Sequence, residues 1–158
     1  MKAHRDRFLQ FCSDITGFSP FQLEGTGLVD TYLALIDGVL GPRAAGFHQF
    51  VGQVVAAPAE KREGILRATL GSWDLNGPVI RGLISLWYLG VWTQLPDTWY
   101  ATAGVPKPGP TDPGRTHVPD STAYIEQLSY RAAGAHPPGA RPTGFGSWSL
   151  PPVCDETV

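Results

Sequence analysis

The segment that decides the fold spans residues 77–92 and reads Gly-Pro-Val-Ile-Arg-Gly-Leu-Ile-Ser-Leu-Trp-Tyr-Leu-Gly-Val-Trp. Arg81 and Ser85 are its main polar interruptions, so a helix formed here has almost no polar face. Pro78 suits position N1 of such a helix. A helix that is apolar all round must be buried on all sides. In a chain of only 158 residues, we expect part of that cover to come from a second protein.

Helical spacing of apolar residues also marks the sequence before this segment. Phe8, Phe11, Cys12 and Ile15 follow the i, i+3, i+4, i+7 pattern, and Gly17 suits a left-handed helix end. Further helices are predicted to start at the capping box Ser19-Pro20-Phe21-Gln22 and to cover residues 28–40, 44–55 and 59–70. The pattern predicts an all-α fold, a small helical bundle whose body covers residues 1–95.

The composition changes from residue 96 onward, because 11 of the 15 prolines lie in residues 96–158. The proline-rich runs 105–113 and 136–142 cannot hold helix or sheet ladders. We therefore predict a Pro/Gly-rich extended C-terminal arm over residues 96–158. One short helix is expected in it, near residues 121–133, with Gly134 as its end.

Large aromatic residues distinguish this arm from a disordered tail, which would be poor in them. Proline lowers the entropy that a chain loses when it is laid along a surface, and docked aromatic side chains offset the remainder. We interpret the arm as a strap over a partner, with packing on its own helices as the alternative. For the tryptophans, core packing is likewise the alternative to partner contact. The candidate partner-interface residues are Trp87, Tyr88, Trp92, Trp99, Tyr124, Phe145 and Trp148.

Charge and hydropathy argue against two classes of partner. The formal net charge is -2 and there is no run of basic residues, so the field that draws a protein onto phosphate backbones is missing. The longest apolar segment is interrupted and falls short of the roughly 20 residues that a membrane helix needs. We expect neither nucleic-acid binding nor a membrane span.

No pattern in the sequence indicates an active site. The histidines, His4, His48, His117 and His136, lack the spacing of a metal motif, and we expect His48 to be a buried neutral imidazole. Gly25-x-Gly27 lacks the third glycine and the preceding strand of a dinucleotide site. We therefore predict no catalytic, cofactor-binding or metal-binding residue in this chain.

The cysteines and the N-terminal sequence bear on location. Cys12 and Cys154 permit one disulfide but form no framework, and free thiols are the expectation. Residues 1–7 lead straight into an amphipathic segment without the apolar region of a signal peptide. A cytoplasmic location is expected on this basis.

Three blocks of sequence resemble the small, or gamma, subunit of FAD-dependent sugar and polyol dehydrogenases, the sorbitol and glucose dehydrogenase complexes. The first is Phe8-Leu9-x-Phe11-Cys12-Ser13-x-Ile15-Thr16-Gly17, followed by a helix through Tyr32-Leu33-x-x-Ile36. The second is Trp87-Tyr88-Leu89-Gly90-Val91, the most distinctive of the three. The third runs from Tyr124-Ile125-Glu126 to Gly144-Phe145-Gly146-Ser147-Trp148, before Pro151.

The resemblance implies a helical, non-catalytic subunit that binds no cofactor. It implies that this subunit stabilises a glucose-methanol-choline type FAD oxidoreductase acting on a sugar, glycoside or polyol, and helps it to fold or to be exported. FAD is then expected in the partner subunit. The chain lacks the family's twin-arginine signal, so removal of such a signal and export is the alternative to a cytoplasmic location. Its proline-rich insertion, residues 106–119, is also longer than the family's usual link.

Two rival functions remain open at the level of sequence. One is a standalone small helical enzyme with His48 or His117 in a pocket, which would turn over a small molecule without a partner. The other is a transient assembly chaperone, which would leave once its client is mature. Low charge and the number of aromatic residues favour a permanent partner over both.

Overall fold

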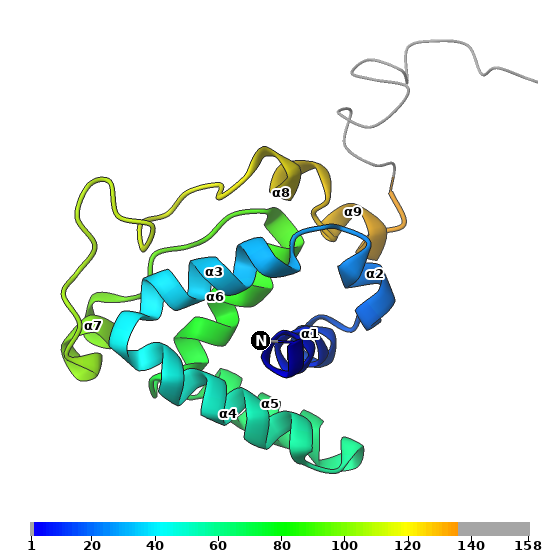
Figure 1. The fold of residues 1–158 in the computed structure, drawn as a ribbon, viewed down its shortest axis with the longest axis horizontal. Coiled ribbons are helices and arrows are strands. Elements are labelled where there is room, and N and C mark those ends of the chain that lie inside the picture. Colours follow the sequence, from blue (N-terminus) through cyan, green and yellow to red (C-terminus); the bar gives the residue numbers. More distant parts are fainter. Residues whose placement is uncertain (1, 136–158) are drawn as a thin grey trace, which may run out of the picture.

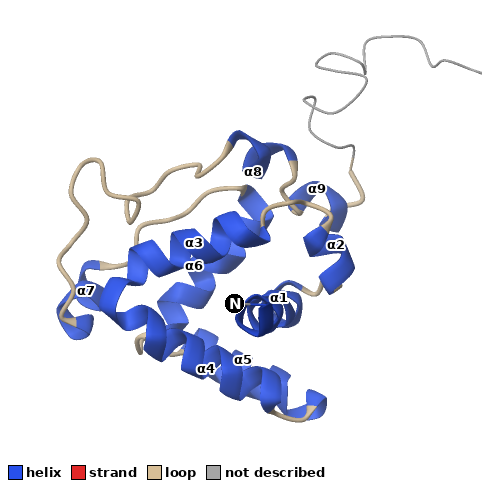
Figure 2. Cartoon of the chain, in the orientation of Figure 1, coloured by secondary structure: helices blue, strands red, loops and turns tan. Residues whose placement is uncertain are grey.

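The computed structural model describes residues 2–135 and places them in one helical array (Figures 1 and 2). No sheet occurs within this range, and Trp92 and His117 form an isolated antiparallel bridge. The predicted all-α class is confirmed. The helices are α1 Lys2–Thr16, α2 Pro20–Glu24, α3 Val29–Leu40, the 3-10 turn η1 Gly41–Arg43, α4 Ala44–Ala56, α5 Ala59–Gly71, α6 Asn76–Leu89, α7 Asp97–Ala103, α8 Ser121–Ile125 and α9 Ser129–Ala132.

Helix α6 is the central element of the fold, as its apolar sequence predicts. It contacts α1, α5 and α8, and its buried side chains include Ile80, Leu83 and Trp87. The Tyr32 hydroxyl of α3 donates a hydrogen bond to the Leu86 carbonyl in this core. Other elements of the same chain therefore bury most of the surface of α6.

The start of α6 differs from the prediction. The helix begins at Asn76, so Pro78 occupies the third position and not N1. The Asp74 carboxylate accepts hydrogen bonds from the backbone N–H groups of Asn76 and Gly77, both at 3.1 Å. These bonds satisfy amides that have no partner within the helix. Burial opposes ionisation of Asp74, but hydrogen bonding to the Ser72 side chain and to these backbone amides lowers its pKa. Because Asp74 accepts these hydrogen bonds, the helix begins two residues before Pro78.

The two helix signals near the N-terminus are confirmed. Helix α1 ends at Gly17, whose φ of 77° lies in the left-handed region that favours glycine. The Ser19 hydroxyl accepts a hydrogen bond from the backbone N–H of Gln22, and the Gln22 side-chain oxygen accepts one from the backbone N–H of Ser19. This reciprocal capping box starts α2.

The first part of the predicted arm packs on the helical body. Trp99 donates from its indole nitrogen to the Leu75 carbonyl at 2.8 Å, and Trp92 exchanges backbone hydrogen bonds with His117. The side chains of Tyr100 and Leu128 are buried in the same core. Residues 96–135 thus pack on the chain's own helices.

The helix predicted near residues 121–133 is split in two. Asp120 caps α8 by accepting from the Thr122 amide, and Gly134, with a φ of 61°, follows α9. Between the two helices, the Leu128 amide donates to the Trp87 carbonyl at the end of α6. This tertiary hydrogen bond replaces the helical one that an unbroken helix would make.

A membrane span is also absent from the described range: none of the helices in residues 2–135 combines the length and the apolar character needed to cross a bilayer.

Candidate partner-binding surface

One face of α6 remains open to solvent, and we call it the α6 outer face. It consists of Arg81, Ile84, Ser85 and Leu89 of α6, together with Trp73 from the link between α5 and α6. Residues 81, 85 and 89 follow i, i+4 spacing, which places them on one side of the helix. Trp73 and Leu89 are 79% and 54% exposed. The face thus presents two large apolar side chains, Trp73 and Leu89, to solvent.

A groove of about 370 Å³ runs along this face. Its second wall is the segment that follows α6, from Thr93 to Pro96. Among the described residues that line the groove, Arg81 is the only charged one. Elsewhere the surface carries ion pairs, such as Arg5 with Glu24 and Asp30, each at 2.7 Å. The groove is thus the less charged part of the molecule.

Trp73 is held in place although it is exposed. The guanidinium of Arg81 lies 5.0 Å from the centre of its ring, within the range of a cation–π contact. Arg81 is itself fixed, because its Nη1 donates to the carbonyls of Leu70 and Ser72 at the end of α5. Its other terminal nitrogen is buried and has no hydrogen-bond partner within residues 2–135. The result is a large, preorganised aromatic surface stacked on a fixed cation.

Three of the predicted interface residues belong to the core. Trp87, Trp92 and Trp99 are buried, so their proposed contact with a partner is corrected to core packing. Trp87 packs edge-to-face on Tyr32, with ring centres 4.7 Å apart. A Cβ on Gly82 would lie 2.8 Å from the Trp92 ring, which shows how closely that ring packs on α6.

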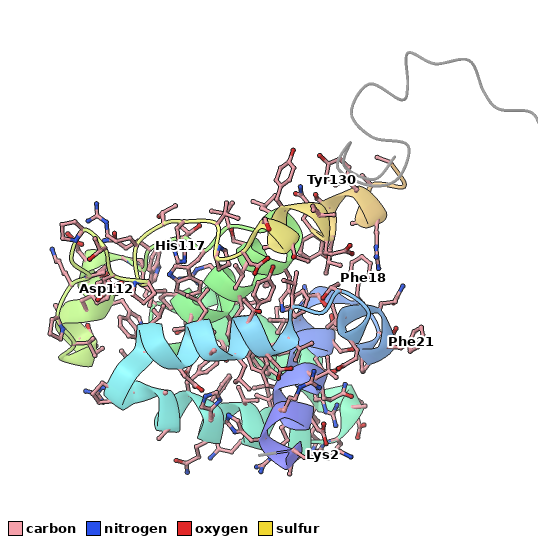
Figure 3. The ribbon with its side chains drawn as sticks, turned by 45° about the horizontal axis from the view of Figure 1, so that its top comes forward. Lys2, Phe18, Phe21, Asp112, His117 and Tyr130 are labelled. Atoms are coloured by element: carbon pink, nitrogen blue, oxygen red, sulfur yellow. The ribbon has the colours of Figure 1, made fainter. Side chains whose placement is uncertain are left out.

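The other predicted residues differ in position. Tyr88 is partly buried and donates its hydroxyl to the Thr16 carbonyl at 2.7 Å. Tyr124 is 47% exposed, and Phe145 and Trp148 lie outside the described residues. Sequence reasoning missed Phe21, which is 86% exposed on α2. For Trp73, as for the other tryptophans, it left core packing and partner contact open, and the structure shows Trp73 exposed. Phe21 extends from the end of the molecule at which Phe18 also lies (Figure 3).

The signal that favours exposure of Trp73 over core packing is its position in the sequence. It stands in a short polar link, Ser72-Trp73-Asp74, between two predicted helices, where a core tryptophan is not expected. Phe21 carries a similar signal, because it follows the helix-starting Pro20 in the solvent-exposed first turn of α2. In both places a large apolar residue occupies a position that local structure directs outward.

The histidines are more closely associated than their sequence spacing predicts. Ligand atoms of His4, Asp37 and His48 lie within 4.8 Å of one another. His48 is partly buried and its Nε2 lies 2.5 Å from the Asp37 carboxylate. His117 is separate, with its Nδ1 at 2.8 Å from the Arg115 carbonyl, and His136 lies outside the described range.

Comparison with known proteins returns no match for this chain. No family model fits the sequence, and no curated protein or solved structure matches it.

Proposed function

We propose that this chain is a non-catalytic small subunit that stabilises a larger FAD-dependent oxidoreductase. The observation that carries the proposal is Trp73, exposed and fixed over Arg81 beside a groove with a single charge. Tryptophan and arginine are the residues most enriched at the energetic centres of protein interfaces. A docked tryptophan buries about 150–250 Å² of surface. The α6 outer face is accordingly the proposed docking surface.

The identity of the partner rests on the resemblance of the three sequence blocks to flavin dehydrogenase small subunits. The partner is accordingly a glucose-methanol-choline type enzyme that acts on a sugar, glycoside or polyol and carries the FAD. The second resembling block, residues 87–91, contains Leu89 of the α6 outer face. In this proposal the small subunit contributes stability alone, because a partner that binds only the folded form shifts the folding equilibrium of both chains.

Co-expression tests the proposal. We expect the FAD oxidoreductase encoded beside this chain's gene to be soluble and flavin-loaded with the chain present, and to be largely lost to aggregation without it. The two should co-elute at fixed stoichiometry in gel filtration. A flavoprotein that is equally soluble and active alone would contradict the proposal. If the two proteins co-elute only until the flavoprotein is mature, the chain is a transient chaperone. If the isolated chain turns over a small molecule, it is a standalone enzyme.

Substitution of Trp73 tests the docking surface. We expect Trp73→Ala to raise the Kd of the complex by about 30-fold or more, as loss of an interface hot spot does. The matched control is Phe21→Ala, which removes another exposed aromatic side chain that does not line the groove. Kd is measured by biolayer interferometry on the purified flavoprotein, and circular dichroism checks that both variants fold. An unchanged Kd for Trp73→Ala, with a weakened complex for Phe21→Ala, would place the interface on α2.

Cell fractionation addresses location. We place the complex in the cytoplasm, and recovery of the mature chain in a periplasmic or secreted fraction would favour export through a removed signal.

A further inference from the structure

His4, Asp37 and His48 come from three helices that meet at one end of the molecule. His4 lies in the first turn of α1, Asp37 in the last turn of α3 and His48 in the second turn of α4. All three pairs of helices are in contact, and the start of α1 lies between α3 and α4 in Figure 1. The turn η1 reverses the chain between α3 and α4, which brings Asp37 opposite His48. The fold thus gathers two imidazoles and a carboxylate from separate elements.

The arrangement of the three side chains is compact. Their ligand atoms lie within 4.8 Å of one another, and the ring centres of His4 and His48 are 4.1 Å apart at an interplanar angle of 74°. His48 Nε2 lies 2.5 Å from Asp37 Oδ1. The His48 side chain is largely buried, whereas about half of the Asp37 side chain is exposed. One ligand is therefore fixed by packing and another is free to adjust.

Hydrogen bonding leaves most of the imidazole nitrogens of this cluster uncommitted. His48 Nδ1 is buried and has no hydrogen-bond partner in the described part of the chain. Within the same range no hydrogen bond involves either ring nitrogen of His4. A buried polar atom without a partner costs free energy, so a purely structural histidine pair is poorly accounted for. Coordination of a cation would use a lone pair of His4, together with the His48 Nε2 atom that faces Asp37.

The electrostatics of the cluster are mixed. Asp37 supplies a negative charge, and Arg7, whose Nε donates to the Ala3 carbonyl, supplies a positive one near His4. The positive charge of Arg7 opposes cation binding. The Asp37 carboxylate, however, forms no ion pair with an arginine or lysine in residues 2–135.

We infer that His4, Asp37 and His48 form a binding site for a divalent transition metal, with Zn²⁺ as the best fit. Two imidazole nitrogens and one carboxylate oxygen are the donors that Zn²⁺ accepts in three-ligand sites, where water completes a tetrahedron. Bonds of about 2.0–2.1 Å in a tetrahedron separate ligand atoms by about 3.3 Å. The half-exposed Asp37 has the freedom to open from its present 2.5 Å contact to that spacing.

The consequence of such a site is a link between α1, α3 and α4. A metal that binds only the folded chain stabilises it by mass action. At a free Zn²⁺ concentration of about 100 times Kd, the thermal midpoint of a chain of this size rises by about 5–10 °C. The inference is independent of the proposed docking surface, because the three ligands lie on α1, α3 and α4, whereas Leu89 lies on α6 and Trp73 in the link before it.

Zinc titration of the full chain tests the site. The chain, free of any histidine tag and treated with EDTA, is titrated with ZnCl₂ by isothermal calorimetry at pH 7.5. We expect one Zn²⁺ per chain with a Kd in the micromolar range or below, and the thermal shift above. Absence of binding at 100 µM ZnCl₂ would overturn the inference.

Variants separate this site from adventitious binding. We expect His4→Gln and Asp37→Asn each to raise the Kd for Zn²⁺ by about 100-fold or more, since even the loss of a supporting residue around a metal costs 10–100-fold. Both positions retain some exposure, so folding is preserved, as circular dichroism will show. His117→Gln is the matched control and should bind as the unmodified chain does. Equal affinity in all three variants would assign the bound zinc to other groups and contradict the site.

Discussion

At the scale of single residues, Cys12 shows how burial sets reactivity. Burial raises the pKa of its thiol from 9.0 to about 12, and the neighbouring Trp87 indole offsets this only in part. At pH 8 a far smaller fraction of the Cys12 thiol is then ionised than of an ordinary exposed cysteine. Because the thiolate is the nucleophile, Cys12 in the folded chain is expected to be inert.

The prediction is that a Cys154→Ser chain is not labelled by Ellman's reagent at pH 8 until urea unfolds it. Prompt labelling of the folded chain would refute this prediction.

The same pKa shift makes the free energy of unfolding fall as pH rises from 9 towards 12, because the unfolded chain releases a proton that the folded chain retains. Tyr32, whose pKa burial also raises, acts in the same direction. Urea midpoints at pH 8 and pH 10.5 measure this fall, and Cys12→Ala should make it shallower.

At the scale of elements, the junction of α5 and α6 depends on one glycine. A Cβ on Gly77 would lie 2.4 Å from the Ser72 carbonyl oxygen and 2.6 Å from that of Thr69, both backbone atoms. We expect Gly77→Ala to destabilise the chain by about 1–3 kcal/mol, because the end of α5 must move. Gly64→Ala, at an open position within α5, is the control and should stabilise by about 0.5–1 kcal/mol. Urea denaturation measures both, and equal effects would contradict the steric explanation.

Elements whose signals are local could be predicted from the sequence, and those that depend on distant contacts could not. The capping box at Ser19 and the glycine end of α1 involve residues within one turn, so sequence alone identifies them. The split between α8 and α9 depends on the Leu128 to Trp87 hydrogen bond, which joins residues far apart in the chain. The start of α6 was misplaced because Asp74 supplies a cap that the proline rule does not include.

The candidate sites follow the same distinction. Exposure of Trp73 is compatible with its polar link, but its position over Arg81 depends on how α5 meets α6. His4, Asp37 and His48 share no spacing motif, and only the packing of α1, α3 and α4 brings them together. Periodicity marks the face that a helix buries, and it contains no information about which side chains of different helices become neighbours.

At the scale of the whole molecule, residues 96–135 and the helical body share one core. Leu128 is fully buried and its backbone bonds to Trp87, while Trp92 donates its indole N–H to the Gly114 carbonyl. Residues on both sides of position 95 thus contribute to the same core. The described arm supplies cover that α6 needs.

Substitution of Leu128 tests this shared core. We expect Leu128→Ala to lower the free energy of unfolding of the full chain by about 2–5 kcal/mol, the usual cost of a buried leucine. Since the arm and body are coupled, tryptophan fluorescence and far-UV circular dichroism should report one coincident urea transition, displaced as a whole. Val118→Ala, about half exposed on the same arm, is the control and should change stability by less than about 0.5 kcal/mol. Two separated transitions, with the tryptophan signal unmoved by Leu128→Ala, would show instead that the body folds without the arm.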